Sequence, residues 1–446
     1  VTDSLGMPAF TSKQIAQWIY QKRAVSIDDF SNISLKNREL LKEHYAVGLS
    51  KPVNAVTSSD GTSKYLVNVD VDGIGAASGR TPHNVETVFI PDGDRATLCV
   101  STQVGCKMGC KFCFTGAQHF TSSLTSAHIM NQILVVPGSM ELTNLVFMGM
   151  GEPLDNLEQV LKTIEILTSP WGLAWSPKRI TVSTVGLRRE LKQLIEGCDC
   201  HIAVSLHASN PLLRESLVPA EKAFSMTEML EVLRRYDFSH QRRLSFEYTM
   251  FQGVNDSLAN AAELVKTLEG LSCRVNLIRY HAIPDVPFQP SPESQMVAFR
   301  DYLTEHGVFS TIRASRGEDV WAACGMLSSK NIHTCAPFPD RERSTSIGTL
   351  FRRQIFLRAS TSSCQCSISE SWLSKSKTRS RQVSSSSRGY IPIICGRCSV
   401  PPCRWVMMAR LLTGSHARAG QEKHLTSLCP STRGQSPAFQ KLEHTG

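Results

Sequence analysis

Three cysteines, Cys106, Cys110 and Cys113, lie within eight residues in the spacing C-x3-C-x2-C. Thiolates at this spacing can bind three irons of a four-iron cluster and leave the fourth iron without a protein ligand. Ordinary electron-carrier clusters use four cysteines, so the open iron is a place where a small molecule can bind. A zinc site is the alternative, but zinc usually takes four ligands in paired groups, and no matching pair follows at a suitable distance. The loop therefore predicts an open [4Fe-4S] cluster.

The chain has 446 residues, enough for two or three domains. It contains no run of 18 apolar residues, so we expect no membrane span. No signal peptide is visible, and a start at Val1 leaves open whether the natural start lies upstream. Fifteen cysteines in such a chain favour a cytoplasmic metal or redox protein over a disulfide-linked secreted one.

Residues 331–446 differ from the rest of the chain. They hold 17 lysines and arginines against 5 aspartates and glutamates, a net charge of +12, so the first 330 residues sum to −3. This Ser/Arg/Cys-rich tail shows neither helical nor strand periodicity, and we expect it to be disordered. The preferred explanation of this unusual composition is translation through a frameshift or a gene-end error. The alternative is a basic arm that binds RNA.

The first 330 residues divide into three segments. Residues 1–50 predict a small helical accessory domain, with Thr11-Ser12 capping a first helix and a second helix near 36–44. Residues 51–96 predict a β-rich connecting segment leading into a barrel. Residues 97–330 alternate strand and helix six times, which predicts an α/β fold with a partial (β/α)6 barrel of parallel strands. The expected strands are 65–69, 85–90, 97–102, 144–148, 179–184, 201–206, 244–250, 274–280 and 308–313, with barrel helices near 125–135, 156–168, 187–196, 226–236, 257–269 and 293–306.

Polar residues follow the ends of four successive predicted barrel strands, where barrels of this kind carry out their chemistry. The cysteine loop follows the first strand, and Gly151-Glu152 follow the second. Ser183 lies at the end of the third strand, and Ser205-Leu206-His207 lie at the end of the fourth. Any one of these groups could simply cap the next helix, but four in succession indicate a ligand site.

The cysteine loop and the Gly-Glu-Pro turn at 151–153 together resemble the radical S-adenosylmethionine (SAM) enzymes. The resemblance implies that the three cysteines bind a [4Fe-4S] cluster and that SAM occupies its open iron. His281 departs from the pattern, because many members of the family carry asparagine there, although either side chain can donate a hydrogen bond to adenosine. The residues that the resemblance implies as SAM contacts are Gly151, Glu152, Ser183, Ser205, Leu206, His207 and His281.

Further segments narrow this resemblance. Residues 313–325, 85–91 and 95–101 are similar to the RlmN-type family of dual-specificity RNA (adenine-C2) methyltransferases, and the similarity covers residues 1–330. The resemblance implies that Cys324 carries a methyl group on its way to C2 of adenosine. It also implies that Glu86 removes the C2 proton as a general base. Cys99 would then resolve the RNA–enzyme adduct by forming a disulfide with Cys324.

The same resemblance implies partners: 23S ribosomal RNA and transfer RNA as substrates, an electron donor such as flavodoxin, no membrane, and a monomeric protein. Arg313 and Arg316, which lie near Cys324 in the sequence, are the better candidates for contacts with RNA phosphates. Three other interpretations stay open: the related adenosine-C8 methyltransferase of antibiotic resistance, an iron–sulfur protein that binds nucleic acid without catalysis, and a damaged gene product without activity.

Overall fold

The computed structural model describes residues 1–69, 83–239 and 242–327, which belong to one compact unit of the chain. The prediction of a disordered tail over 331–446 therefore lies outside the described residues. Within them, no helix is long and apolar enough to cross a membrane.

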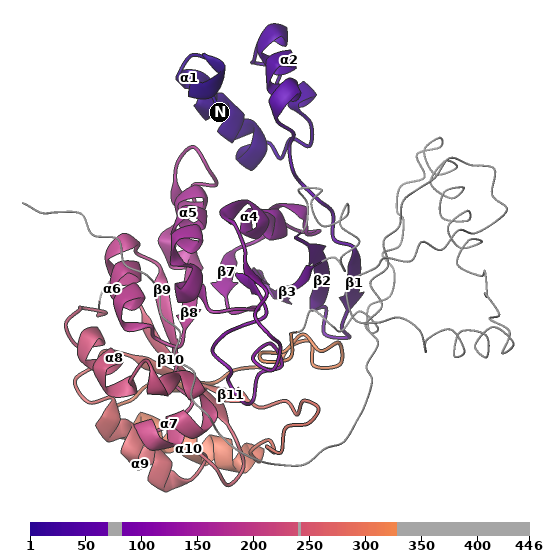
Figure 1. Ribbon diagram of the computed structural model, residues 1–446. Helices are drawn as coiled ribbons and strands as arrows, with labels where there is room; N and C mark the ends of the chain where they lie inside the picture. Colours follow the sequence, from indigo (N-terminus) through magenta and orange to yellow (C-terminus); the bar gives the residue numbers. More distant parts are fainter. Residues whose placement is uncertain (70–82, 240–241, 328–446) are drawn as a thin grey trace, which may run out of the picture. The chain divides into compact units, whose positions relative to one another are not determined.

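Two helices near the N-terminus, α1 (Phe10–Ala16) and α2 (Leu35–His44), belong to a small helical region (Figure 1). Apolar side chains of this region, including Phe30 and Leu41, form a core of their own. The predicted cap of the first helix is wrong. Helix α1 begins at Phe10, its N-cap is Ala9, and no side chain makes a cap hydrogen bond, so Thr11 and Ser12 lie in the first turn instead of capping it.

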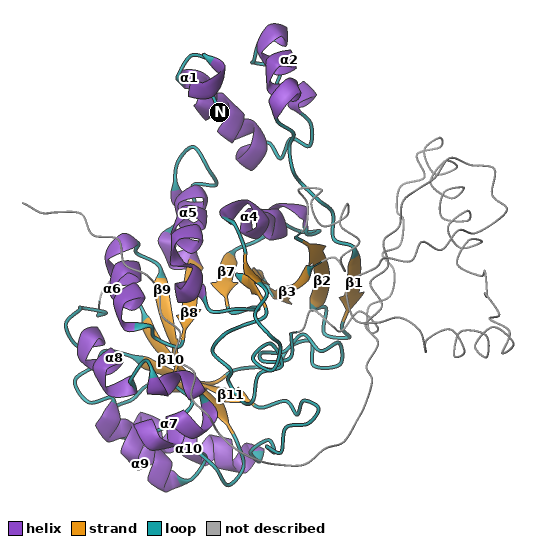
Figure 2. Cartoon of the chain, in the orientation of Figure 1, coloured by secondary structure: helices purple, strands orange, loops and turns teal. Residues whose placement is uncertain are grey.

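One mixed sheet forms the centre of the described fold (Figure 2). Its strands follow the order β1-β2-β3-β4-β7-β8-β9-β10-β11-β12. Pairing is antiparallel from β1 to β4 and parallel from β4 to β12. This order is that of an open barrel extended by antiparallel strands. The strand bounds are β1 Asn54–Thr57, β2 Ser63–Asn68, β3 Asn84–Asp92, β4 Arg95–Cys99, β7 Asn144–Phe147, β8 Ile180–Thr184, β9 His201–Ser205, β10 Leu244–Met250, β11 Arg274–Arg279 and β12 Ser310–Ile312, with a separate pair β5 Gln103–Val104 and β6 Ser122–Ser123.

Helices connect the parallel strands and lie along the outer side of the curved sheet (Figure 2). Each has an apolar stripe at helical spacing. In α6 the buried residues are Leu191, Leu194 and Ile195, which lie on one face and pack on the core. The predicted strand–helix alternation is thus present, with one further helix, α7, that the pattern did not indicate. The helix bounds are α4 Ser126–Val135, α5 Leu157–Thr168, α6 Arg188–Gly197, α7 Pro211–Leu217, α8 Met226–Leu233, α9 Leu258–Thr267 and α10 Glu293–Glu305.

The strand register places Cys99 next to the antiparallel part of the sheet. Cys99 ends β4 and lies opposite Val88 on β3 and Val146 on β7. Because side chains alternate along a strand, Glu86, two residues before Val88, points to the same face as Cys99. The carboxyl ends of the parallel strands β4 to β10 lie at one edge of the sheet. Residues that follow these strands form the site described next.

Candidate active site

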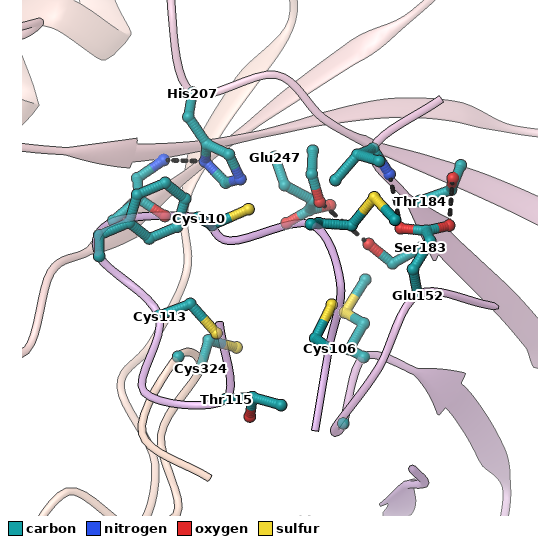
Figure 3. A pocket seen from close by; sticks show the side chains of 18 of the residues that line it. Cys106, Cys110, Cys113, Thr115, Glu152, Ser183, Thr184, His207, Glu247 and Cys324 are labelled. Atoms are coloured by element: carbon teal, nitrogen blue, oxygen red, sulfur yellow. Dashed lines mark hydrogen bonds between the residues drawn. The ribbon is translucent and has the colours of Figure 1, made fainter. Parts of the chain in front are cut away.

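A cavity lies at the carboxyl ends of the parallel strands. It is lined by the cysteine loop, by the turns after β7, β8 and β9, and by the segment after β12. Figure 3 shows the sulfur atoms of Cys106, Cys110 and Cys113 bordering one space, with Glu152 on another side of it. The predicted site residues that line this cavity are Cys106, Cys110, Cys113, Gly151, Glu152, Ser183, Ser205, His207 and Cys324, whereas Leu206, His281, Glu86 and Cys99 are not among its lining residues.

The three cysteines of the loop fit an open iron–sulfur cluster better than a single metal ion. Within the described residues, no three His, Cys, Asp or Glu side chains are grouped so that they could hold one ion. In a four-iron cluster each thiolate binds a different iron, so the three sulfurs need only face the same space. Burial raises the pKa of Cys106 to about 12, and it raises the pKa of Cys110 and Cys113 as well. If these thiols bind a cluster, its iron would supply the positive charge that converts them to thiolates.

Two glycines allow the turn after β7 to pack against the loop after β4. Gly151 has a φ of +97°, and a Cβ at this position would lie 2.5 Å from the Cβ of Gln103. A Cβ on Gly149 would lie 2.6 Å from the carbonyl oxygen of Val100. Both distances are too short for real contacts, so a side chain at either position would displace the turn and move Glu152.

Glu152 is buried, and its carboxylate accepts three hydrogen bonds that fix its orientation. Its Oε1 accepts from Thr184 Oγ1 at 2.6 Å and from the Leu154 N–H at 3.0 Å. Its Oε2 accepts from the Val185 N–H at 3.0 Å. Burial nevertheless outweighs these bonds and raises the pKa of Glu152 from 4.5 to about 7. A cation such as an ammonium group beside this carboxylate would restore its charged form.

Ser183, Ser205 and His207 continue the wall of the cavity at the ends of β8 and β9. The two serine Oγ atoms lie 3.5 Å apart. His207 has a φ of +59°, and its Nδ1 accepts from the Thr249 N–H at 3.0 Å. Burial lowers the pKa of His207 to about 3, so the ring is neutral at physiological pH and its proton lies on Nε2. Leu206, which lies between Ser205 and His207 in the sequence, is buried.

Arg214 on α7 is a buried charge that the sequence pattern did not indicate. Its guanidinium donates to the carbonyl oxygens of Val185 at 2.7 Å, Ser205 at 3.0 Å and Leu206 at 3.3 Å. It also pairs with Glu221 at 2.5 Å, and both side chains are at most 5% exposed. Arg214 therefore ties α7 to the ends of the two strands that bear the serines and the histidine.

Cys324 and Cys99 are neighbours, with Cys324 at the cavity and Cys99 in the sheet beside it. The segment that carries Cys324 is anchored to the cysteine loop, because the Phe114 N–H donates to Gly325 O at 2.7 Å. Burial, and after it the nearby Cys324 sulfur, raise the pKa of Cys99 to about 12. Both cysteines are free thiols. The structure therefore does not support a disulfide bond in the fold, and the transient bond that the resemblance implies stays a prediction.

Glu86 lies on β3 and is fully buried beside Lys64 of β2. Lys64 Nζ is 3.1 Å from Glu86 Oε1, and the two side chains are 0% and 1% exposed. The backbone of Glu86 is fixed by Ser101, which follows β4 and whose Oγ donates to the Glu86 carbonyl oxygen at 2.7 Å. The predicted base is thus on the same sheet face as Cys99, in the antiparallel part of the sheet.

His281, which the resemblance implies as a SAM contact, lies against the segment that carries Cys324. Its Nε2 is 2.5 Å from Ser315 Oγ, and its Nδ1 is 3.2 Å from Glu318 Oε1. The position of His281 follows β11, but the direction of its side chain is set by the segment after β12.

The two arginines predicted to contact RNA lie in different surroundings. Arg313 lines the cavity, where its Nη1 is 3.4 Å from Glu247 Oε2. Nearby Cys324 and, less strongly, Glu247 raise the pKa of Arg313. Arg316 pairs with Asp92 at 2.7 Å. Glu247 was not predicted, although a charged residue inside the apolar strand β10 was a signal for it.

Two family models match the chain. The radical SAM superfamily model matches residues 100–265, and the model of the ribosomal RNA large subunit methyltransferase N-terminal domain matches residues 2–47. A probable dual-specificity RNA methyltransferase RlmN from Bacteroides fragilis is 60% identical over 329 residues, which are 74% of this chain and 93% of the relative. A dual-specificity RNA methyltransferase RlmN from Nitratiruptor sp. is 40% identical, over 74% of this chain and 95% of the relative.

A solved structure shares the fold. The crystal structure of a radical SAM methyltransferase from Sphaerobacter thermophilus is 37% identical and superposes with a TM-score of 0.68, covering 74% of this chain and 96% of that one. The predicted α/β fold with a radical SAM barrel and an N-terminal helical region is therefore confirmed. From these matches over most of the described fold, this chain belongs to the RlmN family of dual-specificity RNA methyltransferases, in the radical SAM superfamily.

Proposed function

We propose that this chain methylates C2 of adenosine in 23S ribosomal RNA (position 2503) and in transfer RNA (position 37), using two SAM molecules, a [4Fe-4S] cluster and a methyl-cysteine intermediate. The observation that supports this most is that the loop of Cys106, Cys110 and Cys113 shares one cavity with Cys324. A protein that only carried a cluster would have no use for a further thiol facing it. The family to which the chain belongs uses such a thiol to carry a methyl group.

The chemistry of the target carbon explains why a cluster and a carrier thiol are both needed. Carbon 2 of adenine is electron-poor and cannot attack the methyl group of SAM directly. When bound at the cluster, SAM supplies a radical that removes a hydrogen atom from the methyl group on the carrier thiol. The residues proposed to hold SAM are Gly151, Glu152, Ser183, Ser205, Leu206, His207 and His281, of which all but Leu206 and His281 line the cavity.

Three side chains of the protein act on the RNA base in this proposal. Cys324 receives the methyl group from the first SAM molecule by direct displacement and then becomes bonded through it to C2 of adenosine, a covalent strategy that divides one hard step into easier ones. Glu86 removes the C2 proton as a general base. Cys99 forms a disulfide with Cys324 as the bond between the Cys324 sulfur and the transferred carbon breaks, which releases the methylated RNA. The target base leaves its stack and enters the cavity, as for other enzymes that modify a base.

The remaining partners follow from the same proposal. An electron donor such as flavodoxin reduces the cluster, and the protein acts as a monomer on its RNA. Arg313 lies beside Cys324 and keeps its positive charge, so we propose that it faces the incoming nucleotide.

Two cysteine variants test the proposal. Cys324→Ala is expected to abolish RNA methylation while the cluster still forms, because the carrier thiol is gone. Cys99→Ala is expected to trap RNA covalently on Cys324, visible as a slow band on a denaturing gel. Cys273→Ala is a matched control, because Cys273 is a partly buried thiol outside the cavity lining.

Two outcomes would count against the proposal. Methylated RNA from Cys324→Ala would remove the carrier thiol from the reaction. If Cys324 becomes methylated in the parent protein but no RNA adduct forms in the Cys99→Ala variant, Cys99 has no role in releasing the RNA. Mass spectrometry of the nucleoside locates the new methyl group, and a methyl on C8 would assign the chain to the related resistance reaction instead.

A further inference from the structure

Lys64 is a fully buried lysine that joins the proposed base to the segment carrying the proposed methyl carrier. Its side chain is 0% exposed, and its Nζ lies 3.1 Å from Glu86 Oε1. Removing two charges from water is costly, so a buried pair of this kind persists only where other contacts hold it. The second contact of Lys64 is with Trp321, whose carbonyl oxygen accepts from Nζ at 3.2 Å.

Trp321 lies three residues before Cys324 and has a φ of +56°, a backbone conformation that a bulky residue adopts only when its surroundings impose it. The turn between β1 and β2 holds the same segment at further points. Asp60 accepts from the Gly317 N–H at 2.9 Å, and the Ser59 N–H donates to Asp319 at 3.2 Å. Lys64, Asp60 and Ser59 all contact the segment before Cys324, and of these three Lys64 is the one that also contacts Glu86.

We propose that Lys64 is a positioning residue, which keeps Glu86 in its ionised form and holds it in register with the Cys324 segment. This inference rests on the function proposed above. The step concerned is a proton transfer. The C2–H bond breaks, its electron pair stays on the adenine ring, and the proton passes to the Glu86 carboxylate, which can accept it only when ionised.

The surroundings of Glu86 support this role. On the β2 side the ammonium of Lys64 faces its carboxylate, and on the β4 side Cys99, opposite Val88, points to the same face of the sheet. Cys99 brings no positive charge, and burial keeps it a neutral thiol. A buried carboxylate that loses a neighbouring cation becomes easier to protonate. Without Lys64, Glu86 would therefore be a poorer base at neutral pH.

The test replaces Lys64 by methionine, which keeps much of the side-chain length but removes the charge. In Lys64→Met, SAM cleavage and methylation of Cys324 continue, but the RNA–Cys324 adduct decays roughly 100-fold more slowly at pH 7, the scale of a lost general base. Release should recover as the pH is raised, because Glu86 ionises again. Lys64→Arg keeps the positive charge and should release RNA faster than Lys64→Met.

Two control variants separate this role from others. Lys162→Met makes the same replacement in an exposed Lys–Glu pair on α5 and should leave adduct decay unchanged. Asp60→Asn weakens a tether of the Cys324 segment without contacting Glu86, so it should leave the pH profile of release unchanged. A shifted pH profile in Asp60→Asn would mean that any loosening of the segment has this effect, and it would overturn the proposal.

Folding is monitored by thermal unfolding, because a buried carboxylate without its partner destabilises a protein. If Lys64→Met does not fold, Glu86→Gln and Lys64→Met/Glu86→Gln carry the test. The proposal requires equal adduct decay in these two proteins, since Lys64 acts through Glu86, and a further slowing in the double variant overturns it. Release at the parental rate and pH profile in a folded Lys64→Met also overturns it. Absence of Cys324 methylation and of RNA methylation in the parent would instead reject the proposed function itself.

Discussion

The buried carboxyl of Glu152 should make the stability of the cluster-free protein depend on pH in a measurable way. Its pKa rises from 4.5 to about 7 because the fold buries it. Since one pKa unit corresponds to about 1.36 kcal/mol, the ionised form costs the folded state about 3 kcal/mol. Glu152→Gln keeps the size of the side chain but never ionises, so it removes this cost.

The direction of the pH dependence of stability depends on whether the folded or the unfolded state binds the Glu152 proton more tightly. The folded state has the higher pKa, so the carboxyl favours folding fully below pH 4.5 and loses this contribution as the pH rises through 7. Glu152→Gln should therefore gain stability relative to the parent by about 3 kcal/mol between pH 4.5 and pH 8. For a domain of this size the difference in melting temperature should grow by roughly 5–10 °C.

The assay is thermal unfolding of the cluster-free parent and Glu152→Gln at several pH values. His207, whose pKa is about 3, contributes less to the stability of the fold as the pH falls below 6.5. Both proteins contain His207, so its contribution cancels in the difference between their stabilities. Glu158→Gln on the exposed face of α5 is the control and should show no such rise. A difference that stays flat from pH 4.5 to pH 8 would refute the reasoning. With the cluster and SAM bound, the parent should recover, because an ammonium group would then pair with the carboxylate.

Three further outcomes are expected. Arg214→Met should destabilise the fold by about 3–5 kcal/mol in thermal or urea unfolding, because it leaves Glu221 buried without its partner, whereas Arg188→Met in an exposed pair should cost less than about 1 kcal/mol. Cys106→Ala should abolish both the brown colour of the reconstituted cluster and SAM cleavage, and a full cluster in this variant would contradict the ligand assignment. Truncation after Lys330 should leave SAM cleavage and RNA methylation unchanged in a single-turnover assay, because the cavity lining within residues 1–69, 83–239 and 242–327 already holds the proposed cluster ligands and Cys324.

The barrel could be predicted from the sequence because its strands and helices carry strong periodic patterns. Parallel strands are buried on both faces and read as apolar runs, as in β9, where the consecutive residues Ile202, Ala203 and Val204 are all buried. Strand β1 gave no such signal, since three of its residues are only partly buried at the edge of the sheet and Thr57 is exposed. Helix α7 escaped prediction because its buried face includes the charged Arg214 instead of an apolar stripe.

The site was predictable where chemistry depends on spacing along the chain. Cys106, Cys110 and Cys113 are close in sequence, so their shared cavity could be expected from sequence alone. The direction of the His281 side chain could not, because it depends on Ser315 and Glu318, more than thirty residues away. Lys64 gave no signal at all, since a lysine in a short strand usually lies in solvent.

The open barrel explains why the Cys324 segment has to be held from the far side of the sheet. Strands β1 and β12 are the two edges of the described sheet, and the segment after β12 returns to the turn between β1 and β2. It therefore bridges the parallel strands, which carry the proposed cluster and SAM ligands, and the antiparallel strands, which carry Glu86 and Cys99. A carrier thiol that receives its methyl group on one side and must reach a base and a second thiol on the other needs such a bridge. In this arrangement the antiparallel extension of the sheet is part of the active site, and Lys64 is the point where the bridge and the base meet.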